Sequence, residues 1–446
     1  MYSKLYQLMR YTNRREWLTQ RYMREFERNQ WLSQEELNQV SWNMLKKLLD
    51  HAYENVPFYQ EHFKKLGLTP QDIKTEEDFR QFPFLTKDDI RKNPDDLIAK
   101  NYARDKMKRK ATSGSTGVPL VLYRDLDYNS ADVAAFTRAR RWFGYELGDK
   151  IAWIWGRRDS IPAKMTLKQM IKRERWFDGY RPTPETLQEY AETLLQWQPT
   201  IIAGYGNVIY VFAEYLANQN IAGIRPKVIE TTGMTIWPHE RQKIEEVFQC
   251  PVSDRYSSHE AGAIISAECP HGNKHIFNDF CYVEIIKDGR PAAPGEMGEV
   301  IITPLHSFGM PLIRYQMADI ATFADSQCSC GRGLPVLREL VGRTTSIFTL
   351  PSGKFLYGGV FRHLALKDTI AIEKFRVHQY TRGKIEVFLQ KGEGFDDSVV
   401  DLIRSRCQEV LEDEPVELKI TVTDDMDTTS SGKFLVTSSD VPITFN

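Results

Sequence analysis

Small and hydroxylated residues gather in one short stretch that could bind phosphate. Residues 111–119 read Ala-Thr-Ser-Gly-Ser-Thr-Gly-Val-Pro. Glycine lets a backbone turn its N–H groups toward an anion, and Ser and Thr hydroxyls donate further hydrogen bonds to phosphate oxygens. The stretch lacks the Gly-Lys-Ser/Thr ending of a Walker-type loop, which disfavours a P-loop nucleoside triphosphatase. A flexible linker is the alternative. The basic run Arg104–Lys110 before it and the β-type run Leu120–Tyr123 after it favour a phosphate cradle at Ser113–Gly117.

A second Ser/Gly loop, near the end of the chain, contains a lysine. Residues 428–433 read Thr-Thr-Ser-Ser-Gly-Lys, and the lysine is Lys433. A lysine in such a loop is ordinarily only solvated. A primary ammonium on a flexible stem can also neutralise charge that develops on a phosphate.

Cysteine and histidine side chains form a candidate metal site in two loop-like stretches. One serine separates Cys328 from Cys330, and Cys269, His271 and His275 lie upstream. Three thiolates and one imidazole would bind zinc as a closed tetrahedral site of the structural type. The residues leave both histidines open as the fourth ligand, and reduced cysteines in a turn are the alternative.

The elements that must position these loops alternate between helix and strand. Residues 1 to about 97 have a helical pattern, and the segment Arg14–Trp31 could make either a membrane-surface helix or, as we favour, an amphipathic helix that covers the core. Further along, the alternation predicts an α/β domain with a buried, largely parallel sheet. Its predicted helices are Asp125–Gly144 and Pro184–Trp197, its strands are Ile151–Trp155, Thr200–Ala203, Val228–Thr232 and Val252–Tyr256, and Tyr282–Thr303 reads as strand–turn–strand around Asp288–Gly289.

The pattern changes again after residue 342. The rest of the chain predicts a compact α+β unit of roughly a hundred residues, a normal size for a domain. We therefore divide the chain into residues 1–342 and 343–446. The predicted elements of the second unit are strands Lys374–His378 and Lys384–Gln390, helix Asp397–Leu411 and strand Val416–Val422.

Composition excludes several classes of protein. The 446 residues are 41% hydrophobic and 27% charged with a formal net charge of −1, so no general affinity for nucleic acid is expected. No apolar run approaches the ~20 residues that cross a bilayer, and the N-terminus lacks the plan of a secretory signal. Six cysteines in such a chain do not form a disulfide scaffold. The cytoplasm is the expected compartment.

Several of these motifs together resemble one family. Residues 112–119 look like the phosphate loop of the acyl-, aryl- and aminoacyl-adenylating ligases. Residues Val56–Tyr59 and Phe84–Lys87 resemble the start of the phenylacetate–CoA ligase branch and its capsule-associated (CapK-type) relatives. Further matches follow in order, so the resemblance covers nearly the whole chain. It implies an α/β fold with a large N-terminal adenylation domain of parallel-rich sheets and helices, followed by a small, mobile α+β domain.

The resemblance also implies roles for individual residues around ATP and Mg²⁺. Tyr256 would pack on adenine, Asp319 would accept the ribose hydroxyls, and Glu260 would hold Mg²⁺. Arg343 matches the arginine at the domain hinge. Lys433 would swing into the site and act in catalysis with Glu260 and Thr116. The predicted ATP-binding set is Ser113, Gly114, Ser115, Thr116, Gly117, Tyr256, Ser257, His259, Asp319 and Arg343.

Four positions depart from the family pattern. Ser257 and Ala318 stand where glycine is usual, His259 replaces Ser or Thr, and Met234 replaces a glutamate beside the adenine. Read without the other motifs, Tyr256–Glu260 would be a surface turn with a lone histidine. Thr344-Thr345-Ser346 also replace the acidic residues common at the hinge.

The acyl pocket and the metal site complete the implied set. Tyr205, Gly206, Gly233 and Met234 would contact the acid, in a pocket that Trp153 and Trp155 could also line. The branch often has the cysteines noted above, and its histidine matches His275. The expected zinc ligands are therefore Cys269, His275, Cys328 and Cys330.

The function predicted from all this has two half-reactions. A small carboxylic acid would attack Mg–ATP to give acyl-AMP and pyrophosphate, and coenzyme A would then displace AMP. Transfer to a carrier-protein thiol or to an amine in polysaccharide or secondary-metabolite biosynthesis is a close alternative. A non-catalytic nucleotide-binding protein is the alternative from another class. The identity of the acid is left open, and so is assembly as a homodimer.

Overall fold

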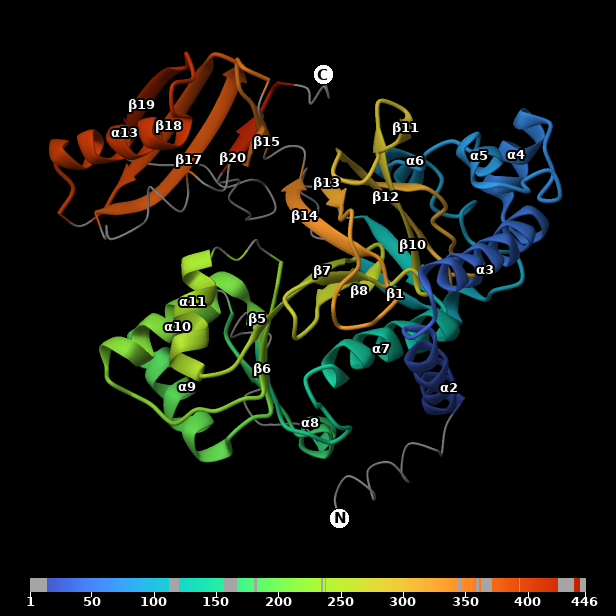
Figure 1. Cartoon of the computed structure of the whole chain (residues 1–446), viewed down its shortest axis with the longest axis horizontal. Helices are drawn as coiled ribbons and strands as arrows, with labels where there is room; N and C mark the ends of the chain where they lie inside the picture. The colour runs from blue at the N-terminus through green and yellow to red at the C-terminus, as the bar shows by residue number, and fades with distance from the viewer. Residues whose placement is uncertain are drawn as a thin grey trace.

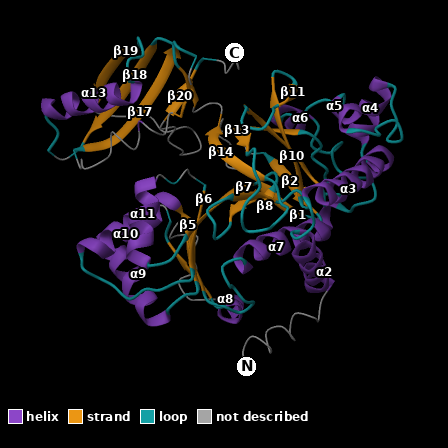
Figure 2. Ribbon diagram, viewed as in Figure 1, coloured by secondary structure: helices purple, strands orange, loops and turns teal. Residues whose placement is uncertain are grey.

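A computed structural model describes most of the chain. The loop residues 112–119, Met234, the hinge residues 344–346 and Lys433, on which several predictions rest, lie outside the described residues. Figures 1 and 2 show the arrangement of the elements. The described residues are 14–111, 120–155, 167–179, 183–233, 236, 238–343, 347–353, 355–357, 361, 371–392, 394–423 and 437–441.

The described N-terminal region is helical, as predicted, and local sequence signals set its boundaries. Ser33, Thr75 and Thr86 each form a capping box, in which the cap hydroxyl and the residue three positions later exchange hydrogen bonds. Pro57 begins one helix, and Gly67 ends it in the left-handed conformation. The helices are α2 (Arg14–Asn29), α3 (Gln34–Asn55), α4 (Pro57–Leu66), α5 (Glu76–Arg80) and α6 (Lys87–Lys92), followed by a 3₁₀ turn at Arg104–Lys106 and the paired strands β1 (Lys108–Ala111) and β2 (Val121–Arg124).

A twelve-stranded sheet forms the centre of the molecule, in the order β11-β10-β12-β13-β14-β9-β8-β7-β6-β5-β3-β4. The run from β4 to β7 is parallel. The predicted helix Pro184–Trp197 and strand Val228–Thr232 are confirmed residue for residue. The elements here are α7 (Leu126–Arg141), β3 (Ile151–Ile154), α8 (Leu167–Lys172), β4 (Glu174–Phe177), α9 (Pro184–Trp197), β5 (Ile201–Tyr205), α10 (Gly206–Asn218), β6 (Val228–Thr232), α11 (Pro238–Phe248) and β7 (Val252–Ser258).

The other half of the sheet is antiparallel, so the sheet is mixed rather than largely parallel. The two-residue connection between β10 and β11 requires an antiparallel pair. At the predicted turn, Asp288 and Gly289 both have positive φ, as a tight hairpin requires. The strands are β8 (Gly262–Glu268), β9 (Lys274–Ile276), β10 (Cys281–Lys287), β11 (Arg290–Pro291), β12 (Met297–Pro304), β13 (Tyr315–Phe323) and β14 (Val336–Arg343).

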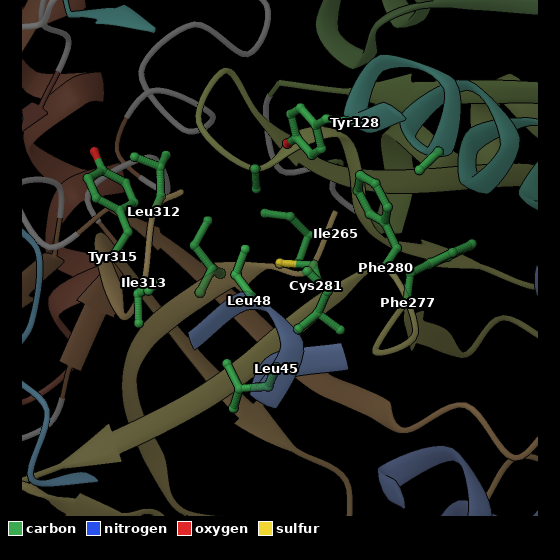
Figure 3. Packing of buried hydrophobic residues seen from close by; sticks show 14 of the residues in the cluster. Leu45, Leu48, Tyr128, Ile265, Phe277, Phe280, Cys281, Leu312, Ile313 and Tyr315 are labelled. Carbon is green, nitrogen blue, oxygen red and sulfur yellow. The ribbon is translucent and has the colours of Figure 1, made fainter. Parts of the chain in front are cut away.

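Helices bury apolar faces on both sides of this sheet. On the parallel half, α9, α10 and α11 pack against Ile154, Ile202 and Ile229. The larger core lies between the N-terminal helices, α7 and the antiparallel strands, and Figure 3 shows Leu45 and Leu48 beside Phe280 and Cys281 within it.

A buried ion pair fixes α7 in that core. Arg138 and Asp279 are both fully buried, and two parallel hydrogen bonds of 2.8 and 2.9 Å join the guanidinium to the carboxylate. Such a bidentate pair holds the helix at a defined position over the sheet.

The C-terminal unit has its own four-stranded sheet, in the order β19-β18-β17-β20, and its own core. It appears at the upper left of Figure 1. The predicted hairpin around residues 381–383 and the helix Asp397–Leu411 are confirmed. The division at residue 343 itself stays a prediction. The described elements are β15 (Ile347–Thr349), β16 (Phe355–Tyr357), β17 (Ile372–Thr381), β18 (Lys384–Lys391), α13 (Asp397–Leu411), β19 (Glu417–Thr423) and β20 (Thr437–Ser439).

Candidate active site

The carboxyl ends of β5, β6 and β7 gather several of the predicted site residues. This edge of a parallel sheet is where α/β proteins usually bind ligands, because the loops there leave a crevice. Tyr205 ends β5, Thr232 ends β6 just before Gly233, and the segment Tyr256–Ser258 ends β7. Strand β13 adds Tyr315 and Asp319 from the antiparallel half.

Tyr256 and Asp319, predicted to contact adenine and ribose, lie against each other. The Tyr256 hydroxyl donates a hydrogen bond of 2.6 Å to Oδ2 of Asp319, although 63 residues separate them. Both side chains are buried. Burial, reinforced by the Asp319 carboxylate, raises the pKa of Tyr256 well above its usual value, so the phenol stays protonated and remains a donor. The pair therefore presents one aromatic ring and one fixed carboxylate from two different strands.

Glu260, predicted to hold Mg²⁺, is also buried and oriented by a tyrosine. The hydroxyl of Tyr315 donates to its Oε1 at 3.2 Å. The Glu260 carbonyl accepts a weaker bond of 3.4 Å from Tyr128. Tyr315 lies on β13 together with Asp319, but nothing in the local sequence predicted a role for it. Only the tertiary fold places its hydroxyl on a carboxylate 55 residues away.

The segment between Tyr256 and Glu260 is part of the sheet and of the turn after it, not a lone surface turn. Ser257 and Thr232 bring their hydroxyl oxygens to 3.2 Å, and Thr232 also donates to the carbonyl of Arg255 at 2.9 Å. Arg124 donates to the His259 carbonyl at 2.7 Å. The serine that replaces the usual glycine thus has a hydrogen-bond partner on the neighbouring strand.

Ala318, the other residue in a usual glycine position, has a left-handed backbone. Its φ is +57°, a region that L-residues other than glycine enter only at a cost. The register of β12 and β13 shifts there, between Glu299 and Ile301, so β13 carries extra residues just before Asp319. Such bulges redirect side chains next to active sites. The strained alanine therefore belongs to the feature that aims Asp319.

The predicted acyl-pocket wall contains a pair of stacked rings. Trp155 and Tyr205, which follow and end the adjacent strands β3 and β5, have ring centroids 4.3 Å apart. Gly233 has a φ of +81°, and a β-carbon there would lie 3.2 Å from the Tyr205 ring. Gly206 begins α10 directly after this tyrosine. Glycine at position 233 thus leaves room for the ring.

The phosphate loop and the hinge are described only at their margins. Strands β1 and β2 pair antiparallel, with Ala111 opposite Val121, so the loop that contains Ser113–Gly117 joins two hydrogen-bonded strands. At the hinge, the backbone of Arg343 pairs with that of Asp319. Lys433 and Met234 lie outside the described residues.

The four predicted metal ligands come together beside β9 and β14. Within the described residues, ligand atoms of Cys269, His275, Cys328 and Cys330 all lie within 4.8 Å of one another. Nε2 of His275 is 3.3 Å from Sγ of Cys330, and Sγ of Cys269 is 3.7 Å from Sγ of Cys328. His271 is instead exposed and hydrogen-bonded to Ser329.

Electrostatics and hydrogen bonding suit this cluster to a metal. Nδ1 of His275 lies 3.0 Å from the carbonyl of Leu334, which fixes the proton there and leaves Nε2 unprotonated and facing the sulfurs. Burial lowers the pKa of His275 to about 4 and raises that of Cys269 to about 11. Burial opposes ionisation of Cys330 too, but hydrogen bonds from Arg332 and Cys328 lower its pKa overall. Zinc requires a neutral imidazole and deprotonated thiols, so its binding here would release the proton of Cys269.

The overall fold is shared with solved CoA ligases. Among solved structures, the chain is similar to a 2-hydroxyisobutyryl-CoA ligase in complex with an acyl-AMP, with a TM-score of 0.72 and 18% identity over 93% of this chain and 92% of that one. This likeness confirms the predicted fold class. A scan against models of protein families gives no match.

Curated relatives identify the family. The chain is 30% identical over 390 residues to a phenylacetate–coenzyme A ligase of Escherichia coli, covering 84% of this chain and 86% of that protein. It is 29% identical over 310 residues to protein CapK of Staphylococcus aureus, covering 68% and 67%. The chain therefore belongs to the phenylacetate–coenzyme A ligase family, as the motifs predicted.

Proposed function

We propose that this ligase activates a small carboxylic acid with Mg–ATP as its acyl-AMP and transfers the acyl group to coenzyme A. The observation that carries the proposal is the convergence of Tyr256 at the end of β7, Glu260 in the turn after it and Asp319 on β13 at the ligand-binding edge of the sheet. The names of the relatives support coenzyme A as the acceptor. A carrier-protein thiol or an amine remains the alternative acceptor.

Each residue has a task that its chemistry suits. The Tyr256 ring offers a stacking face for adenine, and Asp319 accepts hydrogen bonds from ribose hydroxyls while Tyr256 holds one of its oxygens. Glu260 supplies a hard oxygen ligand, and Mg²⁺ would neutralise charge on the phosphates. The Ser113–Gly117 loop would donate hydrogen bonds to phosphate, with Lys433 as the mobile cation.

The first test is pyrophosphate exchange with labelled ATP, screened over aryl, alkyl and amino acids. We expect one class of acid to support exchange and the Lys433→Ala variant to lose at least about a hundredfold in rate, the usual effect of removing a group that stabilises transition-state charge. Exchange at full rate in that variant contradicts the role of Lys433. Bound nucleotide without any acid-dependent exchange supports the non-catalytic alternative instead.

We further propose that Cys269, His275, Cys328 and Cys330 hold one structural zinc ion. Metal analysis of protein purified without chelator should give about one zinc per chain, and Cys328→Ser/Cys330→Ser should lose it and lower the melting temperature. Cys250→Ser is the control, since this cysteine lies outside the cluster. Unmodified protein without stoichiometric metal contradicts the site. Such thiolate ligands and the ATP substrate fit a reducing cytoplasm.

A further inference from the structure

One face of α2 carries a regular stripe of arginine and tryptophan. In the segment Arg14–Trp31 the positions 14, 17, 21, 24, 28 and 31 are all exposed, and they alternate between spacings of three and four residues. For Arg14 to Arg28, which lie within α2, that spacing places the side chains on one side of the helix, along about 20 Å of its length. Trp31 lies in the turn that follows the helix. We call this set the α2 stripe; its members are Arg14, Trp17, Arg21, Arg24, Arg28 and Trp31.

The opposite face of α2 is committed to the core, so the α2 stripe cannot turn inward. Leu18, Met23 and Phe26 are buried in the large hydrophobic cluster. Tyr22 donates a hydrogen bond of 3.1 Å to Asp127 at the start of α7. The sequence left open whether the apolar face of this segment covers the core or meets a membrane. Its apolar face covers the core, and the basic face is the one that remains available.

The arginines of the α2 stripe are not neutralised by nearby acids. None of the four forms an ion pair with any residue that the structure describes. Among the acidic residues that flank the stripe, Glu27 is paired with Arg141 of α7, and Glu16 and Glu25 are half-buried at its sides. In a chain with a formal net charge of −1, this is a local excess of positive charge.

The two tryptophans are unusually exposed for their size. Trp17 is 51% exposed and Trp31 is 57% exposed, and Arg332 lies over the Trp31 ring at 5.0 Å. Tryptophan prefers the boundary between lipid headgroups and acyl chains, where its ring is apolar and its N–H is wet. Guanidinium groups between the two rings would meet lipid phosphates, which they bind in a bidentate way.

We propose that the α2 stripe docks this enzyme on the surface of an anionic lipid bilayer. The helix would lie flat, with arginines at the phosphates and a tryptophan at each end in the headgroup layer. Helix α2 lies at the lower right of the molecule in Figure 1. None of the described helices is long and apolar enough to span a bilayer, so this attachment is peripheral. An acidic protein or a nucleic acid could bind the arginines. Neither partner accounts for the two exposed tryptophans as well as a lipid headgroup layer does.

The test is co-sedimentation with vesicles of phosphatidylcholine, with and without a third of phosphatidylglycerol. The full chain should bind only the anionic vesicles, and binding should weaken as salt is added. Arg21→Gln/Arg24→Gln/Arg28→Gln should lower the partition coefficient by about a hundredfold, since each basic side chain near an anionic surface contributes roughly a factor of five. Trp17→Ser/Trp31→Ser should weaken binding with the charge unchanged.

The control variant removes three positive charges from a different surface of the molecule. Lys47, Lys64 and Lys65 are exposed on α3 and α4, and their triple Gln variant should bind vesicles as the unmodified chain does. Thermal unfolding checks that every variant is folded. The proposal fails if the unmodified chain does not bind anionic vesicles. It fails as well if the triple arginine variant and the triple lysine variant lose binding equally. It also fails if the α2 stripe retains the chain on an oligonucleotide or polyglutamate but not on vesicles.

Discussion

Two tyrosines orient the two carboxylates of the proposed nucleotide site. Tyr256 holds Asp319 and Tyr315 holds Glu260, each through a phenol that burial keeps close to its partner. A carboxylate fixed in this way loses less entropy when it receives a ribose or a metal. The sequence predicted three of these four residues, because their types and order match a family pattern. Tyr315 was not predicted, because its role depends on a contact with a residue that is distant in the sequence.

Loss of the Tyr315 hydroxyl should loosen Glu260 without unfolding the protein. For Tyr315→Phe we expect pyrophosphate exchange to need several times more Mg²⁺ for half-maximal rate, because the carboxylate is no longer held toward the site. The measurement is a magnesium titration of the exchange rate. Tyr190→Phe is the matched control, because its hydroxyl donates to the backbone carbonyl of Asp178 and not to Glu260. An unchanged magnesium requirement in Tyr315→Phe would refute the role of Tyr315.

The left-handed backbone of Ala318 predicts that glycine at this position stabilises the protein. Because its φ is +57°, Ala318→Gly should raise the free energy of unfolding by about 1 kcal/mol. Ala203→Gly, in the regular strand β5, should lower it by a similar or larger amount. Denaturant unfolding of both variants checks the difference in sign. Destabilisation by both substitutions to the same extent would mean that Ala318 carries no strain.

At the scale of elements, local sequence signals predicted the bounds of helices and strands. They did not predict which strands pair when these lie far apart in the sequence. Helix α9 and strand β6 match their predicted bounds because Thr183 caps the helix and β-branched residues fill the strand. The antiparallel half was not foreseen as part of the same sheet. Its strand order places β14 between β13 and β9, and neither periodicity nor turn chemistry encodes such an insertion. The cysteine cluster was predicted, and the family resemblance favoured His275 over His271 as its fourth member. The structure places His275 in the cluster and His271 on the surface.

The Arg138–Asp279 pair should be one of the main contributors to the position of α7. Arg138→Met leaves the Asp279 carboxylate buried without its partner, so we expect a loss of about 3–5 kcal/mol in the free energy of unfolding. Arg141 of the same helix pairs with Glu27 at a site about one-third exposed. Its Met variant should cost less than about 1 kcal/mol. Chemical denaturation of the two variants compares them directly, and equal losses would contradict this assignment.

At the scale of the whole molecule, no hydrophobic cluster of the described residues joins the two units. Every residue of the C-terminal hydrophobic cluster comes after residue 347, and the other clusters contain residues before 341 only. The large sheet is complete at Arg343, where β14 ends. The catalytic arrangement that we propose nevertheless needs both units, because Lys433 comes from the second.

A chain that ends at Arg343 should therefore fold and bind ATP but not catalyse. We expect cooperative thermal unfolding and an upward shift of the melting temperature with Mg–ATP. Pyrophosphate exchange should fall at least as far as in full-length Lys433→Ala, about a hundredfold or more. Calorimetry and the exchange assay test the two halves of the prediction. A truncated chain that fails to unfold cooperatively would place the domain boundary elsewhere.

The insertion of β14 between β13 and β9 also has a consequence for the order of events during synthesis. The parallel run β3–β7 needs no residue beyond Ser258, so it can assemble while the ribosome is still translating the rest. Strand β9 must wait with an open edge for β14, which is translated about sixty residues later. An open edge is prone to pairing with other chains. The cysteine cluster lies where this last pairing forms, beside His275 and Val336. Binding of a metal ion there would stabilise the pairing of β9 with β14 once β14 has been translated, so that the edge of β9 is no longer open.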